Sequence, residues 1–197
     1  MTDNFLKIVK KNILRIIDIE YFFSIKIKKY LTDLDNKIFS TKIMDFSDLK
    51  NFELIFNERG PQYKNTIKKY LNNKDEFIGL IVRDLKTNYI VYSCWIRKKP
   101  FFEPKINKMI ELKNDEAFFT DAHCVKNFRK KGLHSHMMKN RINYCFNNNI
   151  NKAYIVIQAF NNPALKLGKK MDYKFIKSFI RYNKGSIPYY LKRSLES

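Results

Sequence analysis

A short basic turn, Arg129-Lys130-Lys131-Gly132, separates a predicted strand at 117–125 from a predicted helix at 133–147. The first four N–H groups of a helix have no partner within it, and the helix dipole adds partial positive charge there. Such donors bind phosphate, and a glycine lets a ligand approach the backbone closely. The segment therefore predicts a diphosphate site with basic side chains around it. An ordinary strand-to-helix turn with solvated lysines is the alternative.

Two titratable side chains, Asp121 and His123, precede this turn on the predicted strand. A carboxylate or an imidazole can take a proton from an amine nucleophile, directly or through water. The two positions have the same parity, so a regular strand places them on one face. Each also has a structural interpretation, as a hydrogen-bonded core histidine or as a carboxylate that orients a neighbour. Glu116 and Tyr92 are reserve candidates for the base.

Other kinds of site find less support in the sequence. His134 and His136 are two residues apart on the predicted helix and point in different directions, so we expect no metal site. Three cysteines at wide spacings (Cys94, Cys124, Cys145) suit reduced thiols better than disulfides. Nothing resembles a Ser-His-Asp hydrolase or a phosphate-loop ATPase.

Hydrophobic periodicity and turn residues predict the elements that hold these groups. Helices are expected at 4–18, 47–57, 62–72, 133–147 and 163–171, and strands at 21–27, 76–83, 88–97, 117–125, 153–160 and 173–182. The second and third strands form a hairpin, and a loop with Pro100 and Pro104 follows them. This order predicts a mixed α/β fold, with a central, mostly antiparallel sheet of six to seven strands flanked by helices.

The net charge of +20 over 197 residues indicates an anionic ligand, whether nucleotide, phosphate, nucleic acid or membrane headgroup. The basic residues are spread along the chain, as in a protein from an AT-rich coding sequence, so the charge does not select one ligand. The basic amphipathic helix at 4–18 could contact an anionic membrane surface, although packing against its own domain is more common. No run of 18 uncharged apolar residues and no signal peptide is evident, so we expect a cytoplasmic protein.

Residues 76–182 resemble the GNAT superfamily of N-acetyltransferases. Arg129-x-x-Gly132-x-His134 matches the first signature of that family, Arg/Gln-x-x-Gly-x-Gly/Ala. Asn161-x-x-Ala164, followed by Met171-Asp172-Tyr173, matches the later signature, which ends in Gly-Phe. The two signatures lie at the expected separation and in a strand–helix–strand–helix context.

The resemblance implies acetyl-CoA as cofactor, held in a gap between the strands at 117–125 and 153–160. Pantetheine would pair with the backbone of Cys124 and Val125, which would also supply an oxyanion donor, and Asn161 would contact the cofactor arm. Asp121 and His123 would lie beside the thioester, where the family often has a bulge. The pyrophosphate would be bound by the side chain of Arg129 and by the amides of Lys130, Lys131, Gly132, Leu133 and His134.

This chain departs from the family pattern in three places. His134 replaces Gly or Ala, Asp172-Tyr173 replaces Gly-Phe, and Gly168 stands where many members have a tyrosine that protonates the leaving thiolate. Either another group is the acid, or water or the helix end assists the thiolate. On this basis we expect an extension at 1–40, consisting of the amphipathic helix and a strand, and an acyltransferase domain at 41–197.

The expected function is transfer of an acyl group, acetyl above all, from coenzyme A to a primary amine. The segment from Asp121 to Gly132 is similar to that of family members that acetylate nucleotide-linked amino sugars, which indicates such an acceptor. One alternative is a basic nucleic-acid-associated protein on the same scaffold, including a tRNA-directed acetyltransferase. Another is a protein or peptide N-acetyltransferase with an open groove.

Overall fold

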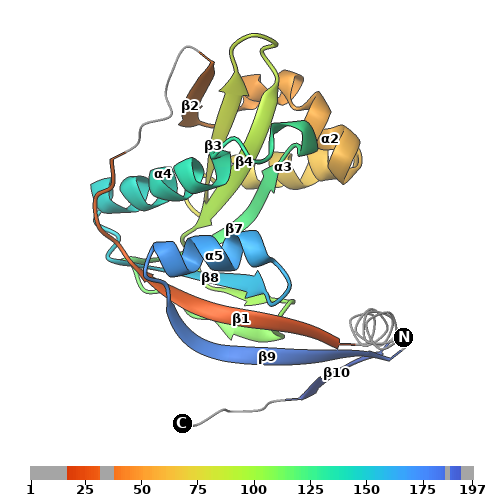
Figure 1. Cartoon of the computed structure of the whole chain (residues 1–197), viewed down its shortest axis with the longest axis vertical. Coiled ribbons are helices and arrows are strands. Elements are labelled where there is room, and N and C mark those ends of the chain that lie inside the picture. The colour runs from red at the N-terminus through yellow and green to blue at the C-terminus, as the bar shows by residue number, and fades with distance from the viewer. Residues whose placement is uncertain (1–16, 32–37, 185–186, 192–197) are drawn as a thin grey trace, which may run out of the picture. The chain divides into compact units, whose positions relative to one another are not determined.

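The computed structural model describes residues 17–31, 38–184 and 187–191, and Figure 1 shows their helices and strands. The chain forms two compact units. The first unit comprises Met1–Ile25, Pro100–Glu111 and Tyr154–Ser197, and the second comprises Lys26–Lys99 and Leu112–Ala153. Each unit is therefore assembled from segments that lie far apart in the sequence.

Four antiparallel strands form the sheet of the second unit. They lie in the order β2 (Phe39–Ile43), β3 (Phe77–Asp84), β4 (Ile90–Arg97) and β7 (Glu116–Cys124). The hairpin expected from 76–83 and 88–97 is confirmed as β3 and β4. Strand β2 was not predicted, because only its first residue, Phe39, is buried and the segment shows no alternation.

Helices cover both faces of this sheet (Figure 1). On one face lie η1 (Phe46–Asn51), α2 (Glu53–Arg59) and α3 (Tyr63–Asn72), and on the other lies α4 (Leu133–Asn147), whose bounds match the prediction. The single helix expected at 47–57 is wrong. The segment is a 3₁₀ turn followed by a short α-helix. The capping box of Asp45 and Asp48 makes the helical segment begin at Phe46, and the fully buried Phe52 lies at the junction between the two helices.

The main core of the second unit lies between the sheet and helices α2 and α3. Trp95 is its largest fully buried side chain and lies against Tyr70 of α3, with 4.8 Å between ring centroids. Gly79 makes room for the indole, because a Cβ there would come within 2.7 Å of Trp95. The buried members of this core are Met44, Phe52, Ile55, Tyr63, Ile67, Leu71, Phe77, Ile81, Ile90, Trp95 and Val125.

The α4 face of the sheet contains a buried charge. Arg141 is 1% exposed, and its guanidinium lies over the Phe119 ring at 4.8 Å. Among the described residues, no hydrogen-bond partner reaches its Nε, Nη1 or Nη2. The cation–π contact offsets only part of the cost of removing this charge from water. Arg141 is therefore a weak point of this layer.

The first unit is built on a second set of strands, in the order β10 (Ile187–Leu191), β9 (Lys174–Lys184), β1 (Ile17–Lys26) and β8 (Lys152–Gln158). Strands β1 and β10 both pair antiparallel with β9. Helix α5 (Asn162–Lys170) follows β8. The loop expected around Pro100 and Pro104 is wrong, since it forms a small hairpin of β5 (Phe101–Glu103) and β6 (Lys108–Ile110) with buried Phe101 and Ile110.

The expected fold class, a mixed α/β fold with a mostly antiparallel sheet flanked by helices, is confirmed. The division into an extension at 1–40 and a domain at 41–197 stays a prediction. Of the helix expected at 4–18, residues 4–16 lie outside the described residues, and Ile17 and Asp18 begin β1 instead. Within 17–31, 38–184 and 187–191, no helix is long and apolar enough to cross a membrane.

Replacing Arg141 with methionine should raise the stability of the protein. The substitution keeps most of the buried volume and removes a charge without a hydrogen-bond partner, so we expect the free energy of unfolding to rise by about 1–4 kcal/mol. Denaturant titration at constant slope measures this change. Arg141→Ala is the control, because it also removes the charge but leaves a cavity and should gain less. A less stable methionine variant would show that the guanidinium contributes to folding.

Candidate active site

Strand β7 carries a bulge at the residues expected to do chemistry. Ser93 of β4 pairs with His123, and Trp95 pairs with Thr120, so two steps on β4 match three on β7. The extra residue adopts a left-handed conformation at Asp121, with φ of 49°. A bulge of this kind breaks the two-residue alternation and re-aims side chains. The bulge breaks the alternation on which the expected shared face of 121 and 123 rested, but both side chains still contact α2, Asp121 through Arg59 and His123 through Glu58.

Asp121 is held by two side chains from the helices. The Nη1 group of Arg59 donates to Asp121 Oδ1, and the Tyr63 hydroxyl donates to Oδ2 at 2.7 Å. The Arg59 guanidinium also lies over the Tyr63 ring at 3.9 Å. Burial, together with the Asp121 charge, raises the pKa of Tyr63 well above its ordinary value, so the phenol stays protonated. Both oxygens of Asp121 are thus engaged, and they tie the bulge to α2 and α3.

His123 is held by a carboxylate from α2. Its Nε2 lies 3.0 Å from Glu58 Oε2, and the backbone N–H of Lys126 donates to Glu58 Oε1 at 2.8 Å. Both side chains are less than a fifth exposed, at 17% for His123 and 18% for Glu58. Glu58 thus connects α2 to the strand and to the turn that follows it.

The electrostatics of this pair define a neutral imidazole with one free basic nitrogen. Burial lowers the pKa of His123, although the hydrogen bond to Glu58 opposes the shift. Burial also acts to raise the pKa of Glu58, but the hydrogen bonds from the Lys126 amide and from His123 outweigh it, and the net shift is downward. An ionised carboxylate only accepts hydrogen bonds, so His123 Nε2 carries the proton and Nδ1 keeps its lone pair. This arrangement suits a general base.

The basic turn has the geometry of an anion site. After the 3₁₀ turn η2 (Lys126–Phe128), Lys130 and Gly132 adopt left-handed conformations, with φ of 64° and 78°, and α4 begins at Leu133. Within the described residues, no protein acceptor is recorded for the N–H groups of residues 130–135. The side chains of Arg129, Lys130 and Lys131 are exposed around them. These donors and charges fit a diphosphate.

His134, which replaces the usual small residue, is turned toward the sheet. Its Nδ1 lies 2.6 Å from the Tyr92 hydroxyl of β4. Burial, helped by the Arg141 charge, lowers the pKa of His134 to about 4, so the ring is neutral near pH 7. Tyr92 is 1% exposed and engaged here, which makes it a structural partner of α4 instead of a reserve base.

At the end of β7, the backbone N–H of Cys124 points away from β4. The Val125 N–H donates to the Val91 carbonyl at 3.0 Å, so Val125 does not supply the expected oxyanion donor. Because hydrogen-bonded and non-hydrogen-bonded pairs alternate, Cys124 opposite Tyr92 directs its N–H and carbonyl away from β4. Arg129 Nε donates to that carbonyl at 3.1 Å. Burial raises the pKa of the Cys124 thiol to about 11, which leaves it protonated and a poor nucleophile.

Two residues of the later signature lie in the first unit. Asn161 caps α5, and its side-chain oxygen accepts from the Ala164 N–H at 3.3 Å, so its expected contact with the cofactor arm stays a prediction. A Cβ at Gly168 would lie 2.7 Å from Cδ2 of Tyr173. The Tyr173 ring thus occupies the space that a side chain at 168 would need, which explains why no tyrosine stands there.

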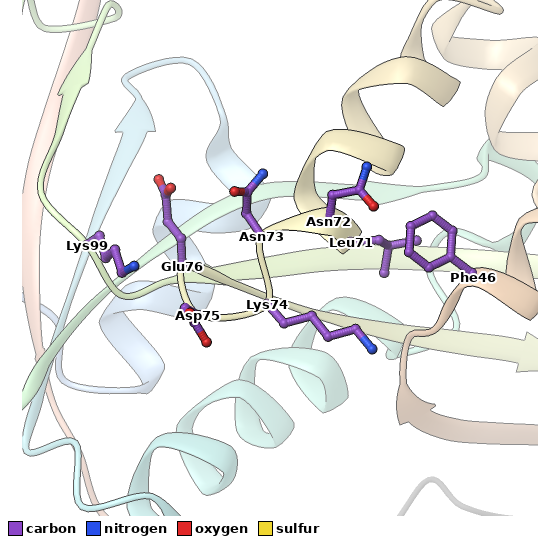
Figure 2. A pocket seen from close by; sticks show the side chains of 8 residues that line it. All are labelled: Phe46, Leu71, Asn72, Asn73, Lys74, Asp75, Glu76 and Lys99. Carbon is purple, nitrogen blue, oxygen red and sulfur yellow. The ribbon is translucent and has the colours of Figure 1, made fainter.

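One cavity lies away from these residues. A cavity of about 410 Å³ opens at the α3–β3 connection, lined by Phe46, residues 71–76 and Lys99 (Figure 2). It lies beside the Phe77–Arg97 pair at the end of β4, whereas His123 pairs with Ser93 in the middle of that strand, so the cavity is separate from the candidate site. In the part of the chain that the structure describes, no three His, Cys, Asp or Glu side chains are placed to bind a metal.

The sequence did not identify Glu58, Arg59 and Tyr63 as parts of the site. They lie more than 55 residues from their partners on β7, and one sequence carries no signal for such a contact. Their local pattern, Glu-Arg-Gly-Pro-Gln-Tyr at a helix–helix turn, marks only a break between helices. Gly60, with φ of 87°, allows the sharp turn between α2 and α3 at this break.

Comparison with known proteins identifies the fold. No protein-family model and no curated protein sequence matches the chain. Among solved structures, a GCN5-related N-acetyltransferase from Sphaerobacter thermophilus superposes with a TM-score of 0.64 and 7% identity. The superposition covers 95% of this chain and 58% of the acetyltransferase chain. The chain therefore spans less than two thirds of the length of this neighbour.

Two other similar structures have narrower descriptions. A glucosamine N-acetyltransferase region of a fungal multi-domain β-N-acetylglucosaminidase matches with a TM-score of 0.60 and 11% identity, over 82% of this chain and 20% of that one. An aminoglycoside acetyltransferase from an uncultured soil metagenomic sample, in complex with sisomicin, matches with a TM-score of 0.50 and 13% identity, over 71% and 90%. The chain thus has the fold of the GNAT acetyltransferases.

The low pKa of His134 predicts a specific loss of stability in acid. In the unfolded chain this histidine binds a proton at its ordinary pKa of 6.5, whereas the folded state resists protonation until about pH 4. Stability is therefore complete above pH 6.5 and falls as the pH drops toward 4, by about 3 kcal/mol from this group.

His134→Gln should remove this component, because glutamine does not titrate and can still bond Tyr92. Urea titrations from pH 7.5 to 4 measure the difference between the two proteins. Parallel stability curves for wild type and variant would contradict the assignment.

Proposed function

We propose that the chain is an acyltransferase that moves the acyl group of an acyl-coenzyme A, acetyl-CoA above all, to a primary amine. One observation carries the proposal: a neutral imidazole held by a carboxylate lies on the strand that leads into six backbone N–H groups for which the described part of the chain offers no acceptor. The imidazole suits proton removal from an amine, and the N–H groups suit a diphosphate. The GNAT fold is consistent with both roles.

The residues of the site have distinct tasks. Acyl-CoA supplies the thioester whose carbonyl carbon the amine attacks. His123 Nδ1 takes the proton that the amine loses, while Glu58 orients the ring and stabilises the imidazolium. The Cys124 N–H, directed away from β4, is the proposed donor to the carbonyl oxygen as negative charge develops on it. Asp121, Arg59 and Tyr63 fix the bulge that aims His123.

The leaving thiolate needs a proton, and Gly168 cannot supply it. Return of the proton from the His123 imidazolium, directly or through water, balances the reaction without a tyrosine at 168. An amino sugar remains the proposed acceptor, in keeping with the glucosamine and aminoglycoside enzymes among the similar structures. We place this activity in the cytoplasm, where acyl-CoA is available and the three thiols stay reduced.

Coenzyme A binding tests the phosphate site. Coenzyme A at about a hundred times its Kd should stabilise the protein by about 2.7 kcal/mol, seen as a higher melting temperature. Gly132→Val should abolish the shift, because a β-branched residue strains the left-handed conformation and obstructs the N–H groups. Lys86→Ala, in the exposed β3–β4 turn, is the matched control. Absence of any heat or shift with CoA compounds would reject the proposal.

A pH profile of thiol release from acetyl-CoA, with amino sugars, peptides and polyamines as acceptors, tests the base. His123→Ala should lower kcat/KM by about 10²–10⁴ and remove the acid limb of the profile. Glu58→Gln keeps a hydrogen-bond acceptor but removes the negative charge that raises the pKa of His123, so the acid limb should move to lower pH. Full turnover by His123→Ala would refute the role of this imidazole. Nucleic-acid binding that falls steeply with salt, without turnover, would favour the nucleic-acid alternative.

A further inference from the structure

The Arg59 side chain lies beside the proposed base and, in the part of the chain that the structure describes, uses only one of its nitrogen atoms, Nη1, in a hydrogen bond. The Arg59 guanidinium gives Nη1 to Asp121 and lies over the Tyr63 ring, so its plane is fixed from two sides. The side chain is 31% exposed. Within the described residues, no acceptor is recorded for Nε or Nη2 of this side chain. A guanidinium held rigid, with free N–H groups at the surface, is suited to bind a carboxylate or a phosphate.

This guanidinium lies next to the base. Arg59 follows Glu58 directly in the chain, and Glu58 contacts His123, while Arg59 contacts Asp121 two residues earlier on β7. The positive charge of Arg59 acts on His123 and opposes its protonation, as does that of Arg129. A ligand that reaches His123 Nδ1 therefore passes close to a fixed guanidinium.

The local charge balance favours an anion at this place. The two carboxylates of the site, Glu58 and Asp121, each accept hydrogen bonds at both oxygens. The exposed cations around them, Lys126 and Arg129, form no salt bridge among the described residues, although the charge of Lys126 acts on Glu58. A cationic amine without an anionic group would meet unfavourable charge here, whereas an amine that carries one would be attracted and oriented.

We propose that the acceptor amine carries an anionic group, a phosphate or a carboxylate, and that Arg59 recognises this group and so selects the substrate. This inference rests on the proposed acyltransferase function. It assigns Arg59 two contacts, one to Asp121 within the protein and one to the substrate. Arg59 is thus a specificity residue as well as a positioning residue for the bulge.

Matched acceptors separate these two contacts. Glucosamine 6-phosphate and muramic acid add a phosphate or a carboxylate to glucosamine, so the three compounds compare the two anions with a neutral reference. Wild type should favour at least one anionic sugar over glucosamine by about tenfold or more in kcat/KM. Arg59→Gln should remove most of that preference, chiefly through KM, while it lowers turnover of glucosamine much less. A loss shared equally by all three sugars would mean that Arg59 acts only on the fold, and would overturn the inference.

An equilibrium measurement covers the case in which none of these sugars reacts. Saturating coenzyme A occupies the turn at 130–135, and inorganic phosphate or acetate is then titrated at constant ionic strength while the melting temperature is followed. Wild type should be stabilised by at least one of these anions, and Arg59→Gln should weaken that apparent affinity about tenfold or more. Lys64→Gln, an exposed cation on α3, is the matched control and should bind like wild type.

The outcomes are distinguishable. No binding of coenzyme A rejects the proposed function, and the inference with it. Coenzyme A binding with an anion effect that is absent, or identical in Arg59→Gln and wild type, overturns the inference and leaves the acyltransferase proposal standing. Arg59→Lys adds a further readout, because it keeps the charge and loses the planar donor pair, so its anion affinity should lie between the other two.

Discussion

The candidate site depends on a single irregularity in β7, the left-handed residue at Asp121. A non-glycine residue in this conformation costs free energy and persists only where its surroundings hold it. Here Arg59 and Tyr63 hold it, one by an ion pair and the other by a hydrogen bond, and both come from helices that pack on the same core as Trp95. The bulge interrupts the regular strand next to His123, whose side chain contacts Glu58.

Helix α2 therefore does more than cover the sheet. Two consecutive residues at its end, Glu58 and Arg59, each bind a different residue of β7, and Gly60 then ends the helix. Glu58 also binds the backbone of Lys126, at the start of the turn that leads to α4. His123, the bulge at Asp121 and the start of the basic turn are thus connected through one helix end, which fixes their relative positions within the second unit.

The sequence predicted the regular elements well where periodicity was strong. Helix α4 was placed to the residue, and β3, β4, β7 and β8 to within two residues, because each buries a continuous face. Short or edge elements were missed: β2 buries little, and the β5–β6 hairpin is hidden by prolines that indicate a loop. The left-handed turn before α4 could be anticipated because Gly132 and its basic neighbours are consecutive in the sequence, and its role as a phosphate site stays a prediction. Glu58, Arg59 and Tyr63 were missed because their contacts join segments about 60 residues apart, and the choice between the Cys124 and Val125 amides stayed open because strand register cannot be read from composition.

The pairing of Gly168 with the Tyr173 ring limits how this chain can change. Neither position can be varied freely, since any larger residue at 168 collides with an aromatic ring that is itself packed near Phe23. A hydroxyl-bearing side chain at 168 would require residues 168 and 173 to change together. A single substitution would leave either a clash or a void. The two positions are therefore sterically coupled, and an engineer who wishes to place a larger side chain at 168 must redesign both residues together.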